Sequence, residues 1–127
     1  MHAEQRSDAT QASEPDPRKI IEAWGRLTSE VAPRVGPIML LLRAAVASDP
    51  EVQSLLDEMD RDRLRRMTLN ARRLHRAGHL RKGVTVTEAA DVLWTYGAPE
   101  LYDLLVLRRR WSRKRYGSFD AMIAKLL

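Results

Sequence analysis

The sequence predicts an all-α domain of about six helices in an orthogonal or antiparallel bundle. Apolar residues recur at spacings of three and four along most of the chain, and proline and capping residues punctuate these runs. No stretch alternates apolar and polar residues long enough for a strand. A length of 127 residues leaves room for one domain, and 44% hydrophobic with 31% charged residues is a globular balance.

The chain begins with a segment unlike the rest. Residues 1–15 contain the acids Glu4, Asp8 and Glu14 against one base, Arg6, and the residues between them are mostly small or polar. This composition predicts a disordered acidic tail. Residues 16–127 are then expected to form the helical ligand-binding and dimerisation domain argued below.

The first two helices are expected on either side of a proline break. Asp16 is a suitable cap for a helix that starts at Pro17, because proline lacks only an amide hydrogen that would be unbonded there. Pro33 and Pro37 predict the break. The second helix then starts at Ile38 and is apolar around most of its circumference.

Four further helices follow from the same signals. Asp49 and Pro50 predict the start of a long third helix that ends near Gly78. Thr85 with Glu88 forms a capping box for the fourth. Pro99 breaks the chain before a fifth helix that is expected to end near residue 109, and Ser112 is expected to cap the sixth.

Three segments resemble the C-terminal half of TetR-family transcriptional regulators. They are the run from Leu41 to Val52, the run from Gly78 to Trp94, and a tail in which Ala98-Pro99-Glu100-Leu101-Tyr102 is followed by Trp111-Ser112 and Tyr116. The resemblance covers about residues 14 to 127 and keeps their order and spacing. It implies a TetR C-terminal-domain-like bundle in a bacterial, cytoplasmic protein.

In that family, this half of the chain senses an effector and dimerises. The resemblance implies that a small apolar ligand enters between helices and that the last two helices pair with a second copy. Family members begin with a three-helix unit of about fifty residues that contains a helix-turn-helix, and only a polar tail precedes Asp16 here. We therefore expect DNA to be bound only through a helix-turn-helix unit absent from this chain. Three explanations for the missing helix-turn-helix unit stay open: the chain is truncated, its start is misassigned, or it is a natural stand-alone domain.

The stretch from Leu101 to Leu107 predicts a homodimer independently of the family. Only Asp103 is polar in these seven residues, so one face of a helix cannot hold all the apolar side chains. The alternative is a helix buried within the monomer. The predicted dimer interface consists of Leu101, Leu104, Leu105, Phe119, Met122, Ile123 and Leu126.

A ligand pocket is predicted on the long third helix. Arg63 and Asn70 share its apolar face, and polar groups on such a face need partners or a cavity. The predicted ligand-binding residues are Met39, Leu42, Arg63, Met67, Asn70, Leu74, Trp94 and Tyr96. The alternative is that Arg63 reaches solvent, Asn70 bonds to the backbone and the others are plain core.

Neither catalysis nor a cofactor is expected. His75 and His79 are four residues apart, but Gly78 is expected to end the helix between them and no third metal ligand has a recognisable spacing. The chain has no cysteine and no glycine-rich phosphate loop. No uncharged run is longer than that from Val35 to Leu42, which is far shorter than the roughly 20 residues of a membrane span. With no secretory signal visible, a cytoplasmic location is expected.

Two other function classes stay open. The net charge of +5 is concentrated in two basic clusters, within 61–82 and from Arg108 to Arg115. The second cluster surrounds Trp111, and such a patch is typical of nucleic-acid binding. Alternatively, the chain is a scaffold that heterodimerises with full-length regulators through the same helices.

Overall fold

The computed structural model describes residue 5, residues 16–125 and residue 127. The predicted acidic tail therefore lies, apart from Gln5, outside the described residues. Across the described part the chain is helical and contains no strand, so the all-α class is confirmed. The helices are α2 (Pro17–Ala45), α3 (Pro50–Arg76), α4 (Val86–Tyr96), α5 (Pro99–Tyr102) and α6 (Arg113–Lys125). A 3-10 turn, η1 (Val46–Ser48), joins α2 to α3, and a π-helical stretch, η2 (Asp103–Arg108), continues α5.

The predicted break at Pro33 and Pro37 is wrong, because both prolines lie inside the single helix α2. Each proline removes one backbone hydrogen bond. Packing offsets this loss, since α6 lies along the first half of α2 and the ring of Tyr102 rests on Gly36. A Cβ atom at position 36 would stand 2.8 Å from that ring. The two helices expected over this stretch are therefore one.

The predicted helix starts after this point are confirmed. The Asp49 carboxylate accepts a hydrogen bond from the Glu51 amide at 3.0 Å, and Thr85 Oγ1 accepts one from the Glu88 amide at 3.1 Å. The Ser112 hydroxyl accepts one from the Arg115 amide at 3.1 Å. Each side chain satisfies an amide that the first helical turn leaves unbonded.

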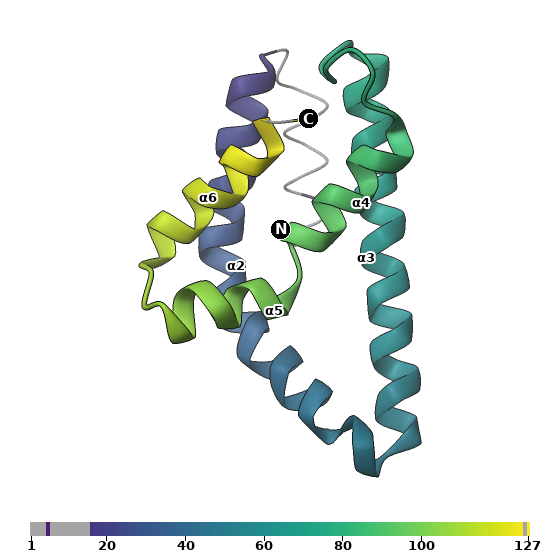
Figure 1. Cartoon of the computed structure of the whole chain (residues 1–127), viewed down its shortest axis with the longest axis vertical. Coiled ribbons are helices and arrows are strands. Elements are labelled where there is room, and N and C mark those ends of the chain that lie inside the picture. Colours follow the sequence, from purple (N-terminus) through teal and green to yellow (C-terminus); the bar gives the residue numbers. More distant parts are fainter. Residues whose placement is uncertain (1–4, 6–15, 126) are drawn as a thin grey trace.

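The helices form two pairs (Figure 1). α2 packs against α6, and α3 packs against α4. The pairs are joined by η1 at one end, where α2 turns into α3, and by α5, which crosses α2 and leads from α4 towards α6. This arrangement brings α2, α3, α4 and α5 close enough for their side chains to meet.

The α2 and α6 backbones approach each other closely at Gly25 and Gly117, which are both buried. A Cβ atom at Gly117 would collide with the Gly25 carbonyl and the Ser29 hydroxyl. That hydroxyl donates to the carbonyl oxygens of Gly25 at 3.0 Å and Arg113 at 3.1 Å. The first pair is thus held by a backbone contact that only glycine permits.

The described core is small and lies where the two pairs meet. One cluster joins Ile20 and Trp24 of α2 to Leu74 of α3, and the other joins α3 to α4 through alanines. Leu80 and Leu93 pack against both clusters. These contacts fix the first half of α2 against the α3 and α4 pair.

One segment of the first pair is apolar on its outside. The stretch Glu22–Ser48 is long and apolar enough to cross a membrane on length and composition alone. Val35, Ile38 and Leu41 are exposed by 44%, 58% and 71%. The same stretch packs on α6 and α5, and it carries Arg43, whose partners are described next.

Candidate functional site

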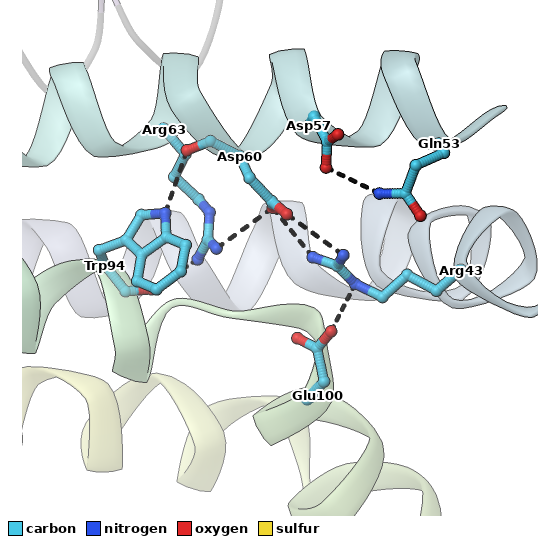
Figure 2. Close-up of polar contacts among 7 residues, drawn as sticks. All are labelled: Arg43, Gln53, Asp57, Asp60, Arg63, Trp94 and Glu100. Atoms are coloured by element: carbon cyan, nitrogen blue, oxygen red, sulfur yellow. Dashed lines mark hydrogen bonds and ion pairs between the residues drawn. The ribbon is translucent and has the colours of Figure 1, made fainter. Parts of the chain in front are cut away.

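A cluster of polar side chains joins four helices (Figure 2). It contains Arg43 of α2, Asp60 and Arg63 of α3, Trp94 of α4 and Glu100 of α5. Arg43 is the only charged residue between Val35 and Ser48. It faces the interior of the fold, which leaves the outside of that segment without charge.

Arg43 is held by two acids. Its guanidinium donates to both carboxylate oxygens of Asp60, at 2.9 and 3.3 Å, and its Nε pairs with Glu100. The hydrogen bond with Asp60 is the main reason why the pKa of Arg43 lies above its ordinary value. About a quarter of each side chain of the Arg43–Asp60 pair is exposed, so solvent screens the pair only in part.

Arg63 binds α4 to α3. It donates a hydrogen bond of 2.6 Å to the Trp94 carbonyl, and its guanidinium lies 5.0 Å from the centre of the Trp94 ring. The indole in turn donates to the backbone carbonyl of Asp60 at 3.1 Å. Burial lowers the pKa of Arg63 from its ordinary value, and Asp60 opposes this effect from 3.6 Å. Arg63 therefore has internal partners and does not simply extend into solvent.

The predicted ligand-binding residues lie in two separate parts of the fold. Arg63 and Trp94 are together in the polar cluster, whereas Leu74 packs with Trp24 in the core. Arg63 and Leu74 are eleven positions apart on one helix, or roughly 16 Å at 1.5 Å per residue. Buried members of the predicted set are Met39, Asn70 and Leu74, and half-buried members are Leu42, Arg63, Met67, Trp94 and Tyr96.

Two buried nitrogens near the first core cluster have no hydrogen-bond partner in the part of the chain that the structure describes. They are the indole Nε1 of Trp24 and Nδ1 of His79. Trp24 packs beside Leu74, and His79 precedes Leu80, which packs on the same cluster. Because an unpartnered buried polar atom is costly, such atoms mark a place for a water or a ligand.

The predicted dimer residues differ in exposure. Leu104 and Met122 are exposed by 49% and 52%, and Leu107, which is outside the predicted set, by 48%. Leu101, Leu105 and Phe119 are half-buried. Phe119 makes edge-to-face contacts with Tyr96 and Trp111. Leu126 and the side chain of Ile123 lie outside the described residues.

Sequence reasoning missed several members of these sites. Arg43 and Glu100 are given no role in the sequence analysis, although a lone arginine in a long apolar segment is a signal for an internal acid partner. The described residues contain no group of three or more His, Asp or Glu side chains that gathers into a metal site.

The geometry thus offers a polar cluster whose groups pair with one another, two unpartnered buried nitrogens and exposed apolar side chains towards the C-terminus. Among the described residues, none of these arrangements places a nucleophile beside a base. A comparison of the chain with protein-family models, curated proteins and solved structures finds no match.

Proposed function

We propose that this chain is the effector-sensing and dimerisation domain of a TetR-like transcriptional regulator, working in the cytoplasm as a homodimer. The resemblance of its sequence to that family motivates the proposal. The observation that carries it is the exposure of Leu104, Leu107 and Met122 on η2 and α6, where the sequence predicts contact with a second copy. Large apolar side chains at about half exposure favour burial in an interface.

The ligand in this proposal is small and mostly apolar, with at least one hydrogen-bond acceptor. The acceptor would satisfy the Trp24 indole N–H, which has no partner among the described residues. The neighbouring Ile20 and Leu74 supply apolar surface. The polar cluster around Arg63 has a different role here, because its groups already bind one another and fix the positions of the helices.

Light scattering on the purified protein tests the assembly. We expect twice the 14.5 kDa mass of one chain at micromolar concentration, with about 1,200–2,000 Å² buried in total. A monomer mass at every concentration would refute the dimer. This measurement requires no knowledge of the ligand.

Thermal unfolding tests the sensor with decanoate, an apolar chain that ends in an acceptor. Ligand that binds only the folded state raises stability by about 2.7 kcal/mol at a hundred times its Kd. We expect decanoate to raise the melting temperature of the native protein and to do so less for Trp24→Phe, which keeps an aromatic ring but has no donor. An equal shift in both proteins would contradict the assigned position of the ligand.

A further inference from the structure

The turn between η2 and α6 carries an unbroken positive charge. From Leu104 to Phe119 the chain has six basic residues and no acid. We call residues 108–115 the basic turn. All six of its charged side chains are exposed: Arg108, Arg109, Arg110, Arg113, Lys114 and Arg115.

Most of this charge is not neutralised within the described chain. Arg108 pairs with Asp103 at 3.1 Å, and the Arg115 guanidinium lies 4.0 Å from the centre of the Trp111 ring. The other four basic side chains form no ion pair with any acid that the structure describes. In the first part of α3, by contrast, arginines are interleaved with acids as far as Asp62, which pairs with Arg65.

Three cations of the basic turn are also repelled by the dipole of α6. Arg113, Lys114 and Arg115 occupy the first turn of α6, where the helix dipole presents its positive end. Cations there are unfavourable for the helix, and the preceding Arg110 has a φ of 58°, which non-glycine residues rarely adopt. Apart from Asp103, the described residues thus supply no acid as a counter-charge to the basic turn, and the helix dipole is unfavourable, so an external polyanion would supply the missing negative charge.

We propose that the basic turn is a contact surface for the phosphate backbone of double-stranded DNA. Five of its six cations are arginines, whose planar guanidinium binds phosphate through two parallel hydrogen bonds. Phosphate contacts carry no sequence information. The surface therefore adds a charge-dependent contact, and base recognition stays with a helix-turn-helix unit.

The surroundings of Trp111 favour duplex DNA over a single-stranded nucleic acid or a membrane as the partner of the basic turn. Trp111 is half-buried, in a T-shaped contact with the ring of Phe119 and with the Arg115 guanidinium over its own ring. It is thus poorly placed to stack on an unpaired base or to enter a bilayer. What the turn exposes is charge, which matches a duplex backbone better than a membrane.

Fluorescence anisotropy with a scrambled DNA duplex, between about 50 and 200 mM salt, tests the proposal. Each neutralised phosphate contributes about −0.9 to the slope of log K against log salt concentration. We expect the variant Arg109→Gln/Arg113→Gln/Lys114→Gln to flatten the slope by about 2 to 3 and to weaken binding at least tenfold at low salt. Circular dichroism confirms that each variant is folded.

The matched control removes the same number of positive charges, three, from α3. Arg61→Gln/Arg65→Gln/Arg72→Gln also replaces three exposed cations and should change the slope by less than about 0.5. Equal weakening by both variants would overturn the proposal, because net charge alone would then explain binding. Stronger binding of the native protein to phosphatidylserine vesicles than to the duplex would assign the surface to membranes and overturn it as well.

Discussion

Arg43 on α2 and Asp60 on α3 form a two-point ion pair, in which the guanidinium donates to both carboxylate oxygens. α2 packs mainly on α6, and α3 packs mainly on α4. The pair therefore connects the two halves of the fold outside the two core clusters, and Glu100 extends the connection to α5. Asp60 is the shared acid, because Arg63 also approaches it.

The first prediction concerns this shared acid. Asp60→Ala leaves the partly buried Arg43 and Arg63 without their common carboxylate, and such hydrogen bonds are worth about 1.5–3 kcal/mol when fully formed. Since a quarter of the pair is exposed and Glu100 still holds Arg43, we expect the free energy of unfolding to fall by about 1–2 kcal/mol. Urea unfolding measures this.

Asp57→Ala is the control for Asp60. Asp57 is an exposed acid one turn earlier on α3, and it accepts one hydrogen bond from Gln53 at 2.7 Å. Exposed pairs contribute little, so the change should stay within about 0.5 kcal/mol. If both substitutions had the same effect, the polar cluster would not connect the halves as described.

Much of the fold was predictable from local sequence signals. Asp49, Thr85 and Ser112 are caps in the structure because their oxygens satisfy the first amides of the following helices. The continuity of α2 was not predictable, because the contact that supports its proline segment comes from Tyr102, far away in the sequence. Local propensity was overridden there by tertiary packing.

The candidate site was predictable only in part. Helical spacing placed Arg63 on the inner face of α3, and the structure finds it there, half-buried against Trp94. Spacing does not reveal which acid will face Arg43, since Asp60 and Glu100 come from two other helices. Nor does it reveal that η2 is π-helical, which shifts the exposure of Leu104 and Leu107 relative to an α-helix.

The second prediction concerns the glycine contact between α2 and α6. Gly117→Ala raises helix propensity by about 1 kcal/mol, but its Cβ atom would meet the Gly25 carbonyl, which is backbone and cannot rotate away. Overpacking of this kind costs about 1–3 kcal/mol. We expect the clash to dominate and the melting temperature to fall. The neighbouring exposed Ser118→Ala should leave it unchanged or higher, and the reverse order would contradict the close contact.

The third prediction maps the dimer. Leu104→Glu or Met122→Glu places a charge in the proposed interface, where burying it without a partner is strongly unfavourable. We expect either variant to be a folded monomer by light scattering at concentrations where the native protein is dimeric. Ser54→Glu, at an exposed position on α3, should not change the mass.

Ile38→Glu distinguishes between the two apolar surfaces. Ile38 is exposed by 58% on the outside of α2, and this face is the strongest competitor for the interface. The proposed map requires Ile38→Glu to stay dimeric. Dissociation by Ile38→Glu, with Leu104→Glu still dimeric, would move the interface from the C-terminal helices to α2.

The last prediction is that the chain does not discriminate between DNA sequences. The basic turn presents cations to phosphates, and base edges are read by side chains that enter a groove in a fixed register. A library of random duplexes, selected on the protein at low salt over repeated rounds, should therefore yield no enriched motif, and binding should weaken steeply as salt rises. Fusing a helix-turn-helix unit before Asp16 should be needed for a motif to emerge. If the 127 residues alone enriched one sequence, and Arg109→Gln/Arg113→Gln/Lys114→Gln abolished that enrichment, base recognition would belong to the basic turn and the sensor assignment would be wrong.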